Sequence, residues 1–510
     1  MTNNNSYDKF NAVNKQRLKN VEVGLECSVN LEVNEPVSKI LAVNVEGECN
    51  HVEALTSEAS VSGNVIVSLV YLTQQGLVNS VMYTSPFMCK LIDSKITPSS
   101  NVFAKVVSAI GQVHSLANNI AKVDCMLTIC GYMLNNEEVT YLKSAGDDVC
   151  TLMEESSYET LCGVCKNSWV ENIEVDVKEP VNRVLTSTCS VHVKNVEPAN
   201  NYVTVTCELV NKILYLTEEE TPVLKTVYTK SEVKQEVECE YSNKESKVEL
   251  DVFVQKNEVK NTISEKENDI KISIEIPLDV CIRVYENKSV NLICDLYSTS
   301  NLTTTTNVSF ENSIVCQPIY FDKKVEGSLT LGDDEPRIDK LLAVNYSKAI
   351  VTNEYIEAGQ YSVSGVISSN LIYFNEDDNM VNSVDVEIPF VVSTQTDYEG
   401  EYLTDLEVIV EDVDVMVKKG KDVFVDALIK VRTKVCNTVQ GVVTSELEYQ
   451  DAIPQKDCAI EIYFAKAGEK VWDIAKRLFV MPETIYNQNP ELPEVLEHDE
   501  QLAIYYKKIN

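Results

Sequence analysis

Long apolar runs, basic side chains and histidines are all scarce in this chain of 510 residues. Because no stretch of about 18 apolar residues occurs, we expect no transmembrane helix. The opening MTNNNSYDKF has neither the basic region nor the apolar region of a secretory signal. These absences predict a protein that stays in the cytoplasm of the cell that makes it.

The shortage of positive charge is large, since 44 lysines and arginines face 79 aspartates and glutamates, a formal net charge of −35. Such a surface repels nucleic acid and anionic lipid, so neither is an expected partner. The acidic residues are spread along the chain, as on solvated strand faces, rather than gathered in one tail. This charge suits either solubility or docking on a partner with a basic surface.

Signals of catalysis are also missing. The four histidines lie far apart, and the sequence has no Gly-x-Ser-x-Gly, P-loop, Gly-x-Gly-x-x-Gly or His-Glu-x-x-His motif. With 16 glycines in the whole chain, phosphate-binding loops are not expected. We therefore expect no enzyme, no cofactor and no metal site.

Cysteine, by contrast, occurs 16 times. Without a secretory signal, we expect every thiol to be free and most to pack as small apolar side chains. Cys162 and Cys165 form a CxxC pair, which admits a metal or redox role. A zinc site needs about four ligands and no second CxxC accompanies this one, so free thiols are favoured here too.

Three segments with a shared opening divide the chain. The openings are EPVSKILAVN from Glu35, EPVNRVLTST from Glu179 and EPRIDKLLAVN from Glu335. A second shared segment begins 26, 26 and 28 residues later: VSGNVIVSLVYL, VTCELVNKILYL and VSGVISSNLIYF, each with tyrosine at its eleventh position. The copies are spaced as domains are, so each should hold its own core.

The repeated segments are rich in Val, Ile, Thr and Tyr, and several alternate, which predicts strands with one buried face. Pro-Phe follows in the first and third copies, at Pro86-Phe87 and Pro389-Phe390, but not in the second. Several strands in each copy predict a mainly β protein of three repeated antiparallel modules, either sandwiches or barrels. The predicted modules are residues 1–165, 166–320 and 321–450.

The C-terminal part follows a different period. Residues from Ile460 alternate as in a strand, and Val471 to Leu478 carries apolar residues at helical spacing. Pro482 stands where a second helix would begin, and QLAIYY has the pattern of a closing strand. The predicted order over residues 459–508 is strand, helix, helix, strand.

This part of the chain resembles the LysM domain. The segment AKAGEKVWDIAKRLFVMPETIYNQNPEL is close to the LysM consensus in its Gly-acid turn, its Trp-Asp-Ile-Ala-Lys helix and its Asn-Pro-Glu-Leu stop. Glu500 and Tyr505 depart from that consensus at the closing strand. The resemblance implies a small α+β domain of βααβ order that binds chitin-like sugars in a groove between two loops.

The same resemblance carries the groove onto two loops of this sequence. The candidate binding residues are Gly468, Glu469, Lys470, Val471, Trp472, Asn489, Pro490, Glu491 and Leu492. Two of them have a structural alternative, because Trp472 could belong to the core and Asn489 could cap the second helix. Charged side chains beside Pro490 and Leu492 suit a protein partner better than a sugar.

Three modules with a Lys-Ile/Leu-Leu-x-Val-Asn signature, ended by one LysM domain, resemble the clostridial spore-coat morphogenetic proteins of the SipL type. That resemblance implies a non-enzymatic assembly scaffold of the mother-cell cytoplasm, located at the forespore surface and in the spore coat. It also implies that the LysM domain docks on the SpoIVA-type ATPase of the coat basement layer, or on another coat protein. The alternative is a protein whose LysM domain binds peptidoglycan through N-acetylglucosamine.

Overall fold

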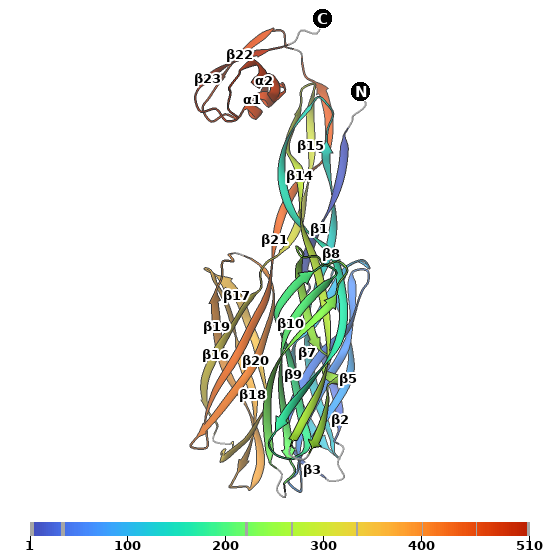
Figure 1. Ribbon diagram of the computed structural model, residues 1–510, viewed down its shortest axis with the longest axis vertical. Coiled ribbons are helices and arrows are strands. Elements are labelled where there is room, and N and C mark those ends of the chain that lie inside the picture. The colour runs from blue at the N-terminus through green and yellow to red at the C-terminus, as the bar shows by residue number, and fades with distance from the viewer. Residues whose placement is uncertain are drawn as a thin grey trace.

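A computed structural model describes residues 5–31, 36–219, 223–266, 269–332, 335–399, 401–454 and 456–506. The chain consists mainly of antiparallel strands, as predicted, with two short α-helices near the C-terminus. Along the long axis lie a broad head, a narrower stalk and a small unit at the far end of the stalk (Figure 1). Within the described residues, no helix is long and apolar enough to cross a membrane.

The first third of the chain sets a plan of seven strands. They are β1 (Ser6–Arg17), β2 (Val21–Asn30), β3 (Val37–Ala54), β4 (Glu58–Thr73), β5 (Val78–Ile92), β6 (Asn101–Ala117) and β7 (Ile120–Ser144). One sheet has the order β3-β4-β5, and in the other β7 pairs with β1, β2 and β6. The two sheets bury one apolar cluster between them, which includes Val67, Leu69 and Leu127. This is the antiparallel sandwich that alternation predicts.

The second and third parts repeat this plan. The second part contains β8 (Val149–Val177), β9 (Val181–Ala199), β10 (Tyr202–Thr217), β11 (Leu224–Glu238), β12 (Lys247–Val254), the short 3₁₀ helix η1 (Lys256–Glu258), β13 (Lys260–Lys266) and β14 (Asp269–Ser298). The third contains β15 (Asn301–Val315), β16 (Ile319–Thr330), β17 (Lys340–Glu357), β18 (Gln360–Asn375), β19 (Met380–Gln395), β20 (Leu403–Lys418) and β21 (Asp422–Ala452). Strand β8 runs across the predicted boundary at residue 165, and the module boundaries stay predictions.

The repeated sequence segments lie on the central strands β4, β10 and β18. Their shared tyrosines Tyr71, Tyr215 and Tyr373 are 1%, 4% and 1% exposed, because the odd positions of each segment face the sandwich core. The neighbouring strands pair with each central strand over nearly its whole length. Burial of one face therefore explains both the alternation and the recurrent tyrosine.

The missing Pro-Phe of the second copy has a packing reason. Gly63 and Gly365 stand directly opposite Phe87 and Phe390 on the adjacent strands. A Cβ at Gly63 would lie 2.9 Å from the Phe87 ring, and one at Gly365 would lie 3.1 Å from the Phe390 ring. In the second copy Cys207 occupies the glycine position and faces valine on the next strand, so the larger side chain replaces the ring. Glycine and phenylalanine thus change together.

The three inner sheets close into a ring in the head. The inner sheets are β3-β4-β5, β9-β10-β11 and β17-β18-β19. Strand β5 contacts β9, β11 contacts β17, and β19 contacts β3, so the last strand of each sheet contacts the first strand of the next. All three parts contribute to one apolar cluster that no single part could bury alone. Its buried members are Leu41, Ala42, Val70, Leu72, Val78, Leu185, Leu214, Leu216, Leu224, Ala343 and Ile372. Each part has its own core, as expected, but the parts also share this one.

The stalk is shared in the same way. The end of β7 pairs with β1, the end of β14 with the start of β8, and the end of β21 with β15. Each of the three ribbons supplies at least one aromatic ring: Phe10 lies 4.5 Å from Tyr158 and 5.2 Å from Phe310 between ring centroids. The rings belong to one apolar cluster with Val139 and Leu292. The stalk is therefore a bundle of three ribbons around a common core.

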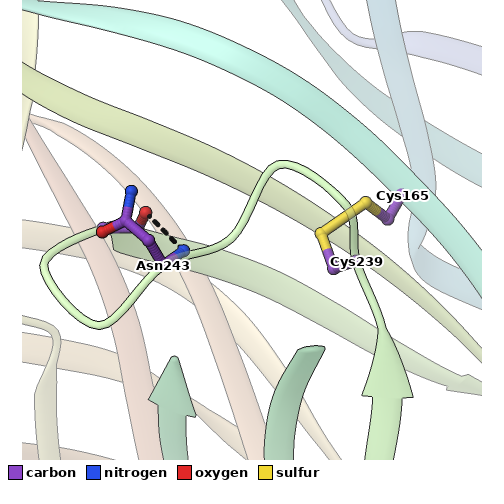
Figure 2. Close-up of a disulfide and its surroundings, with 4 residues drawn as sticks. Cys165, Cys239 and Asn243 are labelled. Atoms are coloured by element: carbon purple, nitrogen blue, oxygen red, sulfur yellow. Dashed lines mark hydrogen bonds between the residues drawn. A yellow bond between two sulfur atoms is a disulfide. The ribbon is translucent and has the colours of Figure 1, made fainter. Parts of the chain in front are cut away.

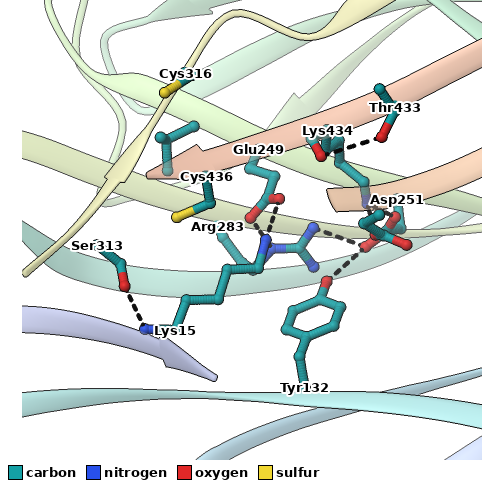
Figure 3. A network of polar contacts seen from close by, with 12 residues as sticks. Lys15, Tyr132, Glu249, Asp251, Arg283, Ser313, Cys316, Thr433, Lys434 and Cys436 are labelled. Atoms are coloured by element: carbon teal, nitrogen blue, oxygen red, sulfur yellow. Dashed lines mark hydrogen bonds and ion pairs between the residues drawn. The ribbon is translucent and has the colours of Figure 1, made fainter. Parts of the chain in front are cut away.

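A buried ionic network joins all three parts of the chain (Figure 3). Arg283, on β14, is 0% exposed. It donates to Glu249 at 3.1 Å and to Asp251 at 2.7 Å. Lys15, from the first part, pairs with Glu249 at 2.5 Å, and Lys434, from the third part, pairs with Asp251. Such groups are retained in an interior only when their charges are matched.

This network should make the fold sensitive to acid. Burial favours the protonated form of Glu249, but the charges of Lys15, Arg283 and Lys434 outweigh it and lower the pKa from 4.5 to about 2. A lowered folded pKa stabilises the protein above pH 4.5, and that stabilisation is lost as pH falls toward 2. At about 1.4 kcal/mol per pKa unit, Glu249 alone contributes on the order of 3 kcal/mol.

We therefore expect urea unfolding to show lower stability at pH 3 than at pH 7. Acid also relieves repulsion among the surface carboxylates, so Glu249→Gln is the matched control: it should be less stable at pH 7 and show a weaker pH dependence. An unchanged pH dependence in Glu249→Gln would mean that Glu249 is not ionised in the native protein.

The cysteines differ from the prediction in one pair. Cys165 on β8 forms a disulfide with Cys239, just after β11, and their Cα atoms are 5.7 Å apart (Figure 2). The prediction that all 16 thiols are free is wrong here, because the middle of β8 and the end of β11 meet only in the folded module. Cys162 is free, and burial raises the pKa of its thiol to about 11. The CxxC motif therefore does not act as a pair.

The C-terminal unit has the predicted βααβ order. Its elements are β22 (Ile460–Ala465), α1 (Val471–Leu478), α2 (Pro482–Gln488) and β23 (Glu500–Tyr505). Strands β22 and β23 pair along their whole length, so the departures at Glu500 and Tyr505 leave the closing strand intact. Its core contains Ile474, Leu478, Ile485 and Ile504.

Candidate functional site

The first predicted loop, residues 468–472, lies beside residues 494–496. That segment follows the second predicted loop, residues 489–492. Gly468, whose φ of +90° suits glycine, donates its N–H to the carbonyl of Leu496 at 2.7 Å. Leu496 in turn donates to the carbonyl of Glu469 at 3.0 Å, and Lys470 forms a bridge with Val495. The backbone thus fixes the edge on which the predicted groove residues stand.

The candidate residues divide by exposure. Gly468, which has no side chain, is exposed, and so are the side chains of Lys470, Pro490 and Glu491, whereas Val471 is fully buried and belongs to the core of the unit. Leu492 is half-buried and packs against that core. A ligand approaching this edge can reach the three exposed side chains directly, while Val471 can act only by supporting the loop.

Glu469 is held in place by its own unit. Its carboxylate accepts hydrogen bonds from the Lys466 N–H at 2.9 Å, the Tyr463 hydroxyl at 3.1 Å and Arg477 at 3.2 Å. The Lys466 N–H contributes most to lowering the pKa of Glu469, so the carboxylate stays ionised. Glu469 therefore presents a fixed negative charge beside Lys470.

Asn489 has a structural task that favours the helix-end alternative. Its side-chain amide donates to the carbonyls of Ile485 at 3.0 Å and Ala503 at 3.2 Å. Its side-chain oxygen accepts the N–H of Ala503 at 3.0 Å. Asn489 thereby ties the end of α2 to β23, and a ligand would have to share a side chain that is already satisfied.

Trp472 contacts the stalk. Its indole N–H donates to the carboxylate of Asp295 on β14 at 2.7 Å. Asp295, Tyr297 and Lys476 also take part in this contact, and the sequence motif for the loops contained no signal for them. They lie up to 181 residues apart in the chain and meet only in the fold.

Two other places in the described residues have features of a ligand site. A cavity of about 940 Å³ lies between the three parts of the head, and several of its charged side chains pair with one another, as Lys105 does with Asp405 and Lys256 with Glu46. On the surface of the first part, Glu26, His114 and Asp124 have the spacing of metal ligands and are all exposed. Lys122 already pairs with Glu26 at 3.0 Å.

Comparison with known proteins adds a family. The family model described as "SipL, SPOCS domain" matches residues 180–262, which cover β9 to β12 and the first residues of β13. Residues 180–262 therefore contain a SipL-type SPOCS domain. No curated protein and no solved structure matches it.

The SPOCS match falls on the part of the fold that recurs along the chain. The matched segment contains the second inner sheet, and the strand plan of that sheet recurs in the first and third parts. The SPOCS family is a family of spore-coat morphogenesis without catalytic activity, and the match relates this domain of the chain to the spore coat.

Proposed function

We propose that this chain is a non-enzymatic scaffold of the spore coat, made in the mother cell and located at the forespore surface. Its C-terminal unit is a LysM domain that docks on a protein of the coat basement layer, with a SpoIVA-type ATPase as the first candidate. The supporting observation is the place of the unit: it stands at the far end of the stalk, away from the closed head (Figure 1).

The chemistry of the exposed edge favours a protein ligand over a glycan. Lys470 and Glu491 are exposed charges beside Pro490, and Glu469 is a fixed carboxylate next to them. A protein contact uses such a charged rim around an apolar centre. Sugar binding depends on apolar stacking and backbone contacts, and Trp472, the indole of the unit, already packs on the stalk.

The test reverses the two exposed charges, Lys470→Glu together with Glu491→Lys, in a fluorescent fusion of the full chain. Both side chains are exposed, so the unit should stay folded, whereas Leu492→Asp would place a charge against the core. We expect the fusion to lose its location around the forespore. Glu500→Lys, an exposed position on β23, is the matched control and should keep it.

Retained location of the charge-reversed fusion, with tight binding of the purified protein to N-acetylglucosamine oligomers, would contradict protein docking and support the peptidoglycan alternative. Circular dichroism of each variant shows whether any loss comes from unfolding.

A further inference from the structure

The end of β14 is shaped toward the C-terminal unit. The register of β14 with β8 shifts between Ile293 and Asp295, so Cys294 is an extra residue in the strand. A bulge of this kind re-aims the side chains that follow it. After this one, Asp295 and Tyr297 both contact the unit.

Four contacts join the stalk tip to the unit. Asp295 accepts one hydrogen bond from Trp472 at 2.7 Å and a charged one from Lys476 at 2.5 Å. The Tyr297 hydroxyl donates to the carbonyl of Val480 at 2.6 Å, and its ring meets the Trp472 ring edge-on at 5.2 Å. These contacts use one face of α1 and the turn after it.

The aromatic half of the contact is buried as an interior would be, whereas the side chains of Lys476 and Asp295 are 42% and 34% exposed. Tyr297 is 3% exposed and belongs to the same apolar cluster as Ile474 and Leu478 of the unit, with Cys150 at its margin. Burial opposes the charge of Asp295, but hydrogen bonds from Lys476 and Trp472 outweigh it and keep the pKa of Asp295 below its usual value. Charge-assisted hydrogen bonds to a half-buried carboxylate are strong and directional.

We propose that the tip of the stalk is a docking surface for helix α1 of the chain's own C-terminal unit, and that it withholds Trp472 from other ligands. The competition that follows rests on the proposed function: a coat protein that binds Trp472 must compete with Asp295. Partners that bind only Lys470, Pro490 and Glu491 can dock while the contact is intact. The stalk tip thereby selects which edge of the unit is presented.

The first test needs no partner. The chain has two tryptophans, Trp169 and Trp472, so Trp169→Phe leaves Trp472 as the reporter. In this background Asp295→Ala should shift the emission to the red and raise acrylamide quenching several-fold. Glu275→Ala, an exposed carboxylate on the same strand, should change neither. Unchanged emission and quenching in a folded Asp295→Ala protein would overturn the docking surface.

The second test measures competition with a purified SpoIVA-type ATPase. If that protein grips Trp472, Asp295→Ala should bind it several-fold more tightly than the unchanged chain, and Trp472→Ala more weakly. Equal affinity of the Asp295→Ala and unchanged chains would overturn competition. Absence of binding by every variant would count against the proposed partner and leave the fluorescence result to decide the docking surface.

Discussion

Replacing Arg283 with methionine should lower the free energy of unfolding by about 3–5 kcal/mol, since it leaves buried carboxylates without their cation. Arg283 is 0% exposed, and its two partners Glu249 and Asp251 are at most 16% exposed in their side chains. Methionine fills much of the same volume, so lost packing is a minor part of the effect. Chemical denaturation monitored by circular dichroism measures it.

Lys288→Met is the matched control for this change. Lys288 is on the same strand, but its ion pair with Glu286 at 3.3 Å is about half exposed. Exposed pairs contribute only about 0–1 kcal/mol, so the control should be nearly neutral. Equal effects of the two substitutions would mean that the ionic network around Arg283 does not hold the three parts of the chain together.

The second large effect is expected at the shared core of the head. Leu214 is 0% exposed and packs with apolar side chains from all three parts of the chain. Leu214→Ala should therefore cost about 2–5 kcal/mol, the range for large cavities in well-packed cores. The loss should appear as one cooperative transition of the whole head, because the cavity lies among its three inner sheets.

Leu302→Ala, at a position 41% exposed near the start of β15, should change stability by less than about 0.5 kcal/mol. A separate early transition in Leu214→Ala, with the first and third parts still folded, would contradict the shared core and favour independent modules.

Local patterns predicted the parts of this fold that local burial determines. Alternation on the central strands placed Tyr71, Tyr215 and Tyr373 correctly, because each side chain simply faces its own sandwich core. Helical spacing after Gly468 predicted α1 for the same reason, and Pro482 at a favoured first position predicted the start of α2. These features depend on residues within a few positions of one another.

Contacts between distant strands could not be predicted in this way. Arg283 stands in an apolar strand pattern. Its role in the ionic network depends on Lys15 and Lys434, which belong to other parts of the chain and pair with the same carboxylates. Cys239 meets Cys165 across 74 residues, and Asp295 meets Trp472 across 177. Spacing in the sequence carries no information about such pairs.

The candidate site was only partly within reach of the sequence. The LysM resemblance led to Lys470, Pro490 and Glu491, which are exposed together on one unit. It could not decide whether Asn489 contacts a ligand or, as the structure shows, ties α2 to β23. Their binding roles stay predictions.

The most direct test of docking through the C-terminal unit is the location of a truncated chain that lacks residues 459–510. Fluorescent fusions of the truncated and complete chains would be compared in sporulating mother cells at equal expression. The proposed function predicts that the complete chain surrounds the forespore and that the truncated chain is dispersed. A truncated chain that still surrounds the forespore would contradict docking through the C-terminal unit.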